Sequence, residues 1–317
     1  MELGLILTGL VLLAAGGEML VRGAVGTARV AGVSPLLVGL TIVGFGTSTP
    51  ELVTSILAAF EEAPGIAVGN VVGSNIANIL LILGIAALIA PLAVQPAAFR
   101  RDGLALVGST VACTAAVLLG YLDRAVGIAL LALLVVYVGW AYWNERKRPD
   151  AESAMHEHVA EDAAPRGRGL ARSLFLAGIG IAATILGARL LVDGAIGLAR
   201  GWGVSETVIG LTIVAVGTSL PELVASVIAA WRRHADVALG NVIGSNIYNV
   251  LGILGLTAVV HPISIPPEIA RFDIWVLVAT TALLMLFLHT GWTLKRWEAA
   301  LFVLAYAVYV GFLATAP

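Results

Sequence analysis

Long apolar runs alternate with short polar breaks along the whole of this 317-residue chain. Each run has roughly the 17–25 residues that an α-helix needs to cross the hydrocarbon core of a bilayer. The first five runs lie at residues 3–21, 36–60, 66–91, 104–120 and 124–143. Five more lie at residues 170–192, 207–231, 237–262, 273–290 and 297–315. The pattern predicts an all-α integral membrane protein with ten transmembrane helices.

The two sets of five spans are copies of each other. A shift of 171 positions carries Glu51 onto Glu222, Gly73 onto Gly244 and Asn78 onto Asn249. The shared blocks are GLTIV, GTS-PELV, GNV-GSNI-N and ILG. Because each copy has an odd number of spans, equivalent helices cross the membrane in opposite directions. Such inverted repeats place the substrate site of many transporters near the midplane, where the two repeats meet.

A polar segment at residues 144–169 joins the copies, and it is charged, rich in Pro and Gly and too short to form a domain. We therefore expect a first five-helix repeat at 1–143, a cytoplasmic linker at 144–169 and a second, inverted repeat at 170–317. Lys and Arg mark the cytoplasmic loops, which places both termini outside. The basic residues on the inner side include Arg22, Arg29, Arg100, Arg101, Arg232, Arg233, Lys295 and Arg296. Arg232 is expected to be dispensable there.

Composition supports a membrane protein, because 59% of the residues are hydrophobic and only 12% are charged, about half the charged share of a soluble domain. The net charge of −2 provides no field that would recruit nucleic acid. Cys113 is the single cysteine, which excludes a disulfide framework. We expect the lipid bilayer as the surroundings, no nucleic-acid partner and no cofactor; the sequence names no protein partner.

The chemistry centres on a proline and a glutamate placed side by side in the second span, Pro50 and Glu51, and repeated as Pro221 and Glu222. An isolated ionised carboxylate at that depth costs roughly 2.5–3.5 kcal/mol. Pro50 cannot donate to the carbonyl four residues earlier and so breaks the helix. Broken backbone inside a bilayer is tolerated only where protein buries it or where it lines a wet cavity. The pattern predicts paired broken helices around an ion site.

Oxygen atoms dominate the side chains around these carboxylates. Thr47 and Ser48 lie on the broken turn, and Ser48 shares a helix face with Glu51 at the i, i+3 spacing. The third and eighth spans add two i, i+4 pairs, Ser74 with Asn78 and Ser245 with Asn249. Oxygen ligands without Cys or His suit Na⁺ and Ca²⁺ and disfavour zinc or copper. Two carboxylates are balanced by one Ca²⁺ or by two Na⁺.

The blocks GTSTPE with GNVVGSNIAN, and GTSLPE with GNVIGSNIYN, resemble the alpha-repeats of the sodium/calcium exchanger family in the cation/calcium antiporter superfamily. The ten spans also resemble its prokaryotic members. The resemblance implies antiport of about three Na⁺ against one Ca²⁺ in the plasma or inner membrane by alternating access. Helices two, three, seven and eight would be broken and form a central ion site. Spans one and six would slide over the other eight.

The resemblance also assigns ligands. Glu51 and Glu222 would be the central shared ligands, and Asn78 and Asn249 match the remaining central positions. Hydroxyls would come from Ser48, Ser74, Ser219 and Ser245, and carbonyls from Gly44, Thr47, Ala215 and Thr218. Thr49 departs from the usual Leu of the family, and Asn249 stands where several members, including potassium-dependent ones, have Asp. The missing charge resembles the potassium-independent branch.

Three other functions need weighing. A Ca²⁺/H⁺ antiporter could use the same glutamates as proton carriers, although that branch usually carries a GN-x-x-E block where this chain has GTS-PE. An ion channel could use the same oxygens, but the inverted repeat and the paired broken helices favour a carrier. An intramembrane protease would need a mid-membrane His beside Ser48 or a pair of Asp, and neither occurs. We therefore expect a transporter that is not an enzyme.

Overall fold

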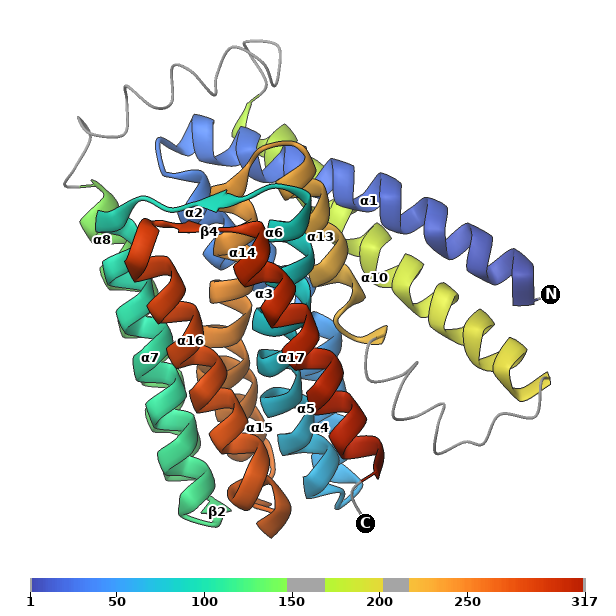
Figure 1. Ribbon diagram of the computed structural model, residues 1–317, viewed down its shortest axis with the longest axis vertical. Helices are drawn as coiled ribbons and strands as arrows, with labels where there is room; N and C mark the ends of the chain where they lie inside the picture. Colours follow the sequence, from blue (N-terminus) through green and yellow to red (C-terminus); the bar gives the residue numbers. More distant parts are fainter. Residues whose placement is uncertain (1, 147–168, 202–216, 316–317) are drawn as a thin grey trace.

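The computed structural model describes residues 2–146, 169–201 and 217–315, and helices make up almost all of it (Figure 1). Five segments contain the helices of the first repeat: α1 (Glu2–Ala31), α2 to α4 (Pro35–Val38, Gly44–Thr47 and Thr49–Phe60), α5 and α6 (Pro64–Ala77 and Gly84–Ile89), α7 (Pro96–Leu118) and α8 (Arg124–Arg146). The second repeat contributes α10 (Leu170–Gly201), α13 (Leu220–Trp231), α14 and α15 (Ala235–Tyr248 and Gly255–Val260), α16 (Ile274–Gly291) and α17 (Arg296–Thr315).

The predicted spans are confirmed in these segments. Eight described helices are long and apolar enough to cross a membrane, and the bent pair 35–47 and 49–60 makes a ninth candidate. The seventh predicted span corresponds to the shorter apolar helix α13, because part of that span lies outside the described residues. Most of the predicted linker, at residues 147–168, also lies outside them, so its boundaries and the predicted orientation stay predictions.

Helix α1 extends ten residues beyond the apolar run that predicted it. The run ends where Glu18 and Arg22 begin a charged stretch, but the two side chains form an i, i+4 ion pair at 2.5 Å that suits a helix. The helix ends instead at Gly32, whose φ of +65° is one that glycine adopts easily. The N–H of Val33 then bonds the carbonyl of Ala28 at 3.1 Å, which closes a Schellman cap.

The third and eighth spans cross at the centre of the bundle and are its most buried long helices. Each contains a π-helical segment, Asn78–Leu83 in one and Asn249–Leu254 in the other, and these segments start at equivalent asparagines. The interruption predicted for these spans is therefore a change of hydrogen-bond register within a continuous rod. Further π-helical segments lie at Gly39–Val43 and Ile269–Asp273.

Glycines allow the second span to approach α14 closely. A Cβ at Gly39 would lie 2.9 Å from the carbonyl oxygen of Val237, and one at Gly240 would lie 3.0 Å from the Cα of Gly39. Such short approaches are typical of helix contacts in membranes. Gly69 and Gly73, the equivalents of Gly240 and Gly244, make no such approach among the described residues; residues 207–215, equivalent to 36–44, lie outside them.

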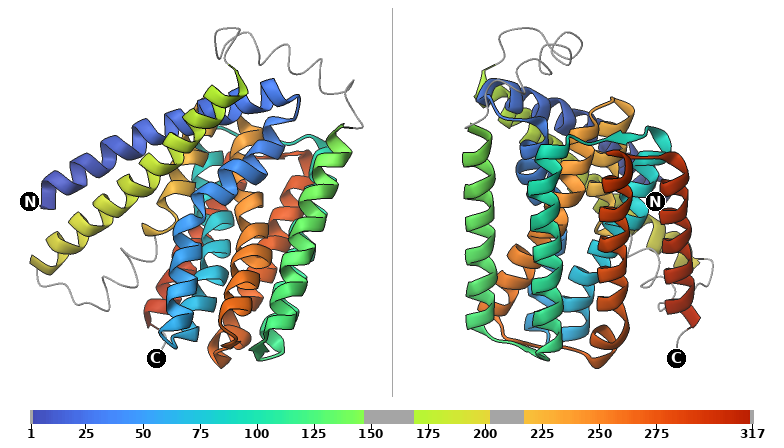
Figure 2. Two further views of the ribbon diagram at one scale, coloured as in Figure 1. Left: turned by 180° about the vertical axis from the view of Figure 1, so that it is seen from behind. Right: turned by 60° about the vertical axis from the view of Figure 1, so that its left-hand side comes forward.

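The long helices α1 and α10 lie side by side, obliquely across one side of the bundle (Figures 1 and 2). They run antiparallel, because Gly9 faces Gly187, Gly16 faces Gly180 and Gly23 faces Ala177. The glycines recur every seven residues on each helix, so one stripe of backbone meets another. This pair joins the two repeats directly.

Two short antiparallel strand pairs, which the sequence patterns did not predict, tie loops together at opposite ends of the bundle (Figure 1). β1 (Leu92–Ala93) pairs with β4 (Thr293–Leu294), and β2 (Tyr121–Leu122) pairs with β3 (Ile263–Ser264). Two-residue strands are too short for an alternating pattern to be visible. Each pair joins a loop of one repeat to a loop of the other, as an inverted repeat requires.

Candidate ion-binding site

The two central glutamates each lie in the first turn of a helix that follows a break. Ser48, with φ −79° and ψ 10°, separates α3 from α4, and the two helices meet at 44°. Ser219 has the same role before α13, with φ −89° and ψ 8°. Glu51 and Glu222 are each only 1% exposed. The proline in the first turn fixes the break, and the helix N-terminus favours the negative charge that follows it.

The serines of the breaks hold the glutamates crosswise between the repeats. Ser48 Oγ donates to Glu222 Oε1 at 2.9 Å, and Ser219 Oγ donates to Glu51 Oε1 at 3.0 Å. The predicted shared face of Ser48 and Glu51 is therefore not used for a contact between them. A regular i, i+3 spacing assumes an unbroken helix, and the helix breaks at Ser48 itself.

The asparagines at the start of the π-helical segments are also held across the pseudo-two-fold axis. Asn78 Nδ2 donates to Asn246 Oδ1 at 2.9 Å, and Asn249 Nδ2 donates to Asn75 Oδ1 at 3.0 Å. Asn78 is 1% exposed and Asn249 is fully buried. Each amide nitrogen therefore has a protein partner on the opposite repeat, and each amide oxygen has none in the described part of the chain.

Within the described ranges, five buried side-chain oxygens have no hydrogen-bond partner. Four of them belong to the predicted central ligands: Glu51 Oε2, Glu222 Oε2, Asn78 Oδ1 and Asn249 Oδ1. The fifth, Thr27 Oγ1, lies in α1. Leaving a buried acceptor unpaired costs about 1–3 kcal/mol, so four of them in two symmetry-related pairs indicate a ligand that supplies positive charge. Carboxylate and amide oxygens are the ligands that Na⁺ and Ca²⁺ prefer.

The other predicted ligands are distributed unevenly around this centre. Ser245 Oγ donates to the carbonyl of Gly44 at 3.2 Å, which brings these two together. The hydroxyl of Thr47 donates to the carbonyl of Val43 at 3.0 Å, and the assignment of its own carbonyl as a ligand, which the resemblance implies, stays a prediction. Ser74 is buried and Thr218 borders a pocket. Ala215 lies outside the described residues, so its assignment stays a prediction.

Two asparagines that sequence reasoning missed support the glutamates from behind. Asn70 Nδ2 donates to the carbonyl of Glu51 at 3.0 Å and to Ser55 Oγ at 2.9 Å. Asn241 Nδ2 repeats this with the carbonyl of Glu222 at 3.1 Å and with Ser226 Oγ at 2.8 Å. The signal was present in the shared GNV block of both repeats. The partners, however, are backbone carbonyls, which every residue has, so the sequence does not reveal which residue each asparagine contacts.

Thr49, the departure from the family pattern, also has a structural role. Pro50 leaves the carbonyl of Gly46 without its helical donor, and Thr49 Oγ1 donates to that carbonyl at 2.9 Å. Leu220 at the equivalent position has no hydroxyl with which to do the same. The two breaks are therefore satisfied differently.

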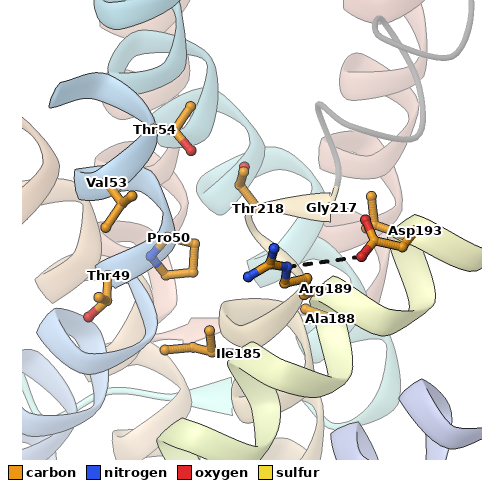
Figure 3. Close-up of a pocket in the computed structure, with 11 residues that line it drawn as sticks. Thr49, Pro50, Val53, Thr54, Ile185, Ala188, Arg189, Asp193, Gly217 and Thr218 are labelled. Atoms are coloured by element: carbon orange, nitrogen blue, oxygen red, sulfur yellow. Dashed lines mark ion pairs between the residues drawn. The ribbon is translucent and has the colours of Figure 1, made fainter. Parts of the chain in front are cut away.

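A pocket of about 400 Å³ lies beside the helix breaks (Figure 3). It lies between α4, α10 and the first described residues of the seventh span, and its walls include Pro50, Val53, Ala188 and Thr218. Arg189 and Asp193, whose Nε and Oδ2 are 4.0 Å apart, lie on α10 beside it (Figure 3). Pro50 and Thr218, which line the pocket, directly precede Glu51 and Ser219 in the sequence.

The equivalent region of the inverted half is closed. A shift of 171 positions relates Ala188 to Gly17 and Val53 to Val224, and there a Cβ on Gly17 would lie 2.6 Å from Val224 Cγ1. Arg232 of α13 also forms an ion pair with Glu18 of α1, with 2.6 Å between Nη2 and Oε1. Among the residues that the structure describes, the molecule is thus open beside α10 and closed beside α1.

Comparison with known proteins is consistent across sequence and structure. The family model described as sodium/calcium exchanger protein matches residues 1–143 and 172–315. A putative antiporter, CaxA, of Alkalimonas amylolytica is 39% identical over 96% of each chain. The sodium/calcium exchanger MaX1 of Methanosarcina acetivorans is 34% identical, again over 96% of each chain. A structure of the sodium-calcium exchanger NCX_Mj soaked with Na⁺ and Ca²⁺ superposes with a TM-score of 0.83 at 34% identity, covering 100% of this chain and 98% of the other.

Proposed function

Because this chain belongs to the sodium/calcium exchanger family, a family of multi-pass membrane cation antiporters, we propose that it exchanges Na⁺ for Ca²⁺ across the plasma or inner membrane. The observation that carries the proposal is the group of four buried acceptor oxygens without partners, two from glutamates and two from asparagines. They are related in pairs by the inverted repeat. A cation fits such a group, whereas a neutral substrate would leave two carboxylates unbalanced.

The charge of the site supports competition between the two cations. Two buried carboxylates are balanced by one Ca²⁺ or by two Na⁺, and a third Na⁺ would bring a net positive charge. Our proposed stoichiometry of about three Na⁺ per Ca²⁺ rests on the family. Exchange in that ratio moves one net charge per cycle, so an imposed membrane potential should change the uptake rate.

We also propose that transport does not require K⁺. Asn249 is neutral, and its amide nitrogen is bound to Asn75 Oδ1, so the position contributes one oxygen and no charge. A carboxylate there would add a third negative charge and so favour an additional monovalent cation. The Glu51, Glu222, Asn78 and Asn249 oxygens would form the centre of the site, with Ser48, Ser74, Ser219 and Ser245 around them.

Alternating access is supported by the pocket beside α10. In this conformation that pocket borders Pro50, the residue before Glu51, while at the equivalent place beside α1 Gly17 packs against Val224 among the described residues. With both termini outside, as the distribution of basic residues predicts, the open side faces the exterior. We propose that α1 and α10 move together to close this path and open the opposite one.

The proposal is tested by Ca²⁺ flux into proteoliposomes. Vesicles loaded with Na⁺ and diluted into Na⁺-free, K⁺-free buffer should take up ⁴⁵Ca²⁺ while the pH is clamped on both sides. Protein-free vesicles give the background. Uptake driven by a proton gradient and not by Na⁺ would overturn Na⁺ coupling and favour a Ca²⁺/H⁺ antiporter. Uptake that needs added K⁺ would contradict K⁺ independence alone.

A further inference from the structure

Behind the candidate ligands, Asn75 and Asn246 form a second layer of amides, and neither residue was singled out by the sequence patterns. They occupy equivalent positions in α5 and α14, and they are 2% and 0% exposed. From their contacts we infer that Asn75 and Asn246 are positioning residues that fix the orientation of the Asn249 and Asn78 amides, so that both oxygens face the transported cation. The inference rests on the proposed function, and it assigns a role to residues outside the ligand set.

The two residues bond each other's backbone in a closed exchange. Asn75 Nδ2 donates to the carbonyl of Asn246 at 3.1 Å, and Asn246 Nδ2 donates to the carbonyl of Asn75 at 3.2 Å. A backbone carbonyl can only accept a hydrogen bond. The nitrogen of each side chain must therefore point at the carbonyl, and the Oδ1 atom of each must point away from it.

The fixed orientation of the Asn75 and Asn246 amides also orients the amides of the candidate ligands. Asn246 Oδ1 accepts from Asn78 Nδ2 at 2.9 Å, and Asn75 Oδ1 accepts from Asn249 Nδ2 at 3.0 Å. Because an amide has its oxygen and nitrogen on the same carbon, binding the nitrogen on one side presents the oxygen on the other. These oxygens, Asn78 Oδ1 and Asn249 Oδ1, are the two amide atoms without a partner in the described part of the chain.

A reversed amide would damage the site twice. If Asn78 turned over, its oxygen would face Asn246 Oδ1, and two acceptors would repel each other. Its NH₂ group would then point toward the place proposed for the cation, where it would repel positive charge. Without the second layer nothing in the hydrogen bonds described for Asn78 and Asn249 would select one orientation. The serine hydroxyls of the site need no such layer, because a hydroxyl rotates to suit its partner.

The crosswise arrangement gives a specific test. Asn246 orients Asn78, and Asn75 orients Asn249. Substitutions within one of these pairs should therefore have non-additive effects on Ca²⁺ affinity, and substitutions in different pairs should have additive effects. Equilibrium ⁴⁵Ca²⁺ binding to purified protein in Na⁺-free detergent solution measures them without requiring transport. We expect Asn246→Leu, which keeps the branched shape and removes both hydrogen bonds, to weaken binding about tenfold, the factor that corresponds to one lost hydrogen bond of about 1.4 kcal/mol.

Double mutants separate positioning from general structural support. In an Asn78→Ala background the amide to be oriented is absent, so adding Asn246→Leu should weaken binding less than twofold further. In an Asn249→Ala background the same change should again cost about tenfold. Asn75→Leu should give the opposite pattern, and it is the matched control. Equal effects in both backgrounds, or no effect on binding in wild type, would overturn the inference.

Folding and the proposed function are checked separately. A monodisperse elution profile and an unchanged unfolding temperature establish that each variant folds, and Asn246→Ser and Asn75→Ser replace the leucine variants if these do not. Wild-type protein that binds Ca²⁺ but shows no coupling pattern would leave the exchanger proposal intact and remove the positioning role. Wild-type protein that binds no Ca²⁺ would overturn both.

Discussion

At the scale of single residues, Glu51 and Glu222 each divide their two oxygens between the protein and the proposed cation. One oxygen of each accepts from a serine of the opposite repeat, and the other has no partner in the described ranges. The serine bond sets the direction of the carboxylate, and the second oxygen is left for an ion. Charge and orientation are therefore supplied by different repeats.

Glu51→Gln and Glu222→Gln should each reduce Na⁺-driven Ca²⁺ uptake at least about a hundredfold. Removing one charge from a buried ionic site costs about 3 kcal/mol or more, and the amide NH₂ of Gln can also point at the cation. Proteoliposome uptake at saturating Ca²⁺ measures the loss. Glu61→Gln, the same change at an exposed residue beyond the end of α4, should leave uptake unchanged. Normal exchange by either site variant would refute the site.

Sequence reasoning named the candidate ligands but not the hydrogen bonds that connect them. Glu51, Asn78 and their equivalents could be found because a polar residue inside an apolar span is costly, and its recurrence at the same position in both repeats indicates a function. The roles of Asn70, Asn75, Asn241 and Asn246 were hidden, because their partners are carbonyls and amides on other helices. The crosswise serine contacts were also beyond reach, since a break at Ser48 changes which side chains face each other.

At the scale of elements, the α1–α10 pair depends on the absence of side chains at regular intervals. A Cβ at Gly180 would lie 2.7 Å from the Cα of Leu20, and one at Gly16 would lie 2.8 Å from the N of Thr184. Neither contact can be relieved by rotating a side chain, because both involve backbone. A larger residue must push the two helices apart.

Gly180→Val should therefore slow transport while leaving Ca²⁺ binding nearly intact, because the proposed ligands lie on other helices. Overpacking of this kind costs typically about 1–3 kcal/mol. The matched control is Gly178→Val on the same helix, where an added Cβ meets nothing within 4 Å among the described residues. Uptake rate and equilibrium ⁴⁵Ca²⁺ binding should be compared in both variants. Equal uptake by the two would show that close packing of the pair is not needed.

The positions of helices were predictable where hydropathy determines them. They were less predictable where the pattern of backbone hydrogen bonds determines them. The long apolar runs and the shift of 171 positions were sufficient for the spans and the inverted repeat. The π-helical segments at Asn78–Leu83 and Asn249–Leu254 were not predictable, because a change from i+4 to i+5 bonding leaves the apolar pattern almost unaltered. The end of α1 was missed because Glu18 and Arg22 interrupt the apolar run, although Ala24, Val25 and Ala28 beyond them are buried in the core.

At the scale of the whole molecule, Arg232 has a partner that its position in a basic loop did not reveal. Its Nη2 and Nε atoms contact Glu18 at 2.6 and 3.0 Å, and Glu18 also binds Arg22. The pair joins α1 to α13 on the closed side of the molecule. The expectation that Arg232 is dispensable did not include this ion pair, and it stays a prediction.

Arg232→Gln should shift the balance between the two access states rather than abolish transport. The side chains are 53% and 24% exposed, and such pairs contribute about 0.2–1 kcal/mol, which is at most about a fivefold change in an equilibrium. In vesicles of known orientation, the half-saturating Ca²⁺ concentration should fall on the side that is closed here and rise on the other. Arg233→Gln is the control, and identical behaviour of the two variants would contradict a role for the ion pair.

The crosswise bonds between Ser48 and Glu222, and between Ser219 and Glu51, have a consequence for the history of the gene. Neither repeat can complete a site alone, since each supplies the carboxylate that the other orients. A single-repeat ancestor could have formed this site only as a dimer of chains inserted in opposite orientations. Duplication and fusion would have fixed one orientation for each half. Surface positions such as Glu18 and Arg189 were then free to diverge, while the residues that meet at the centre had to stay alike.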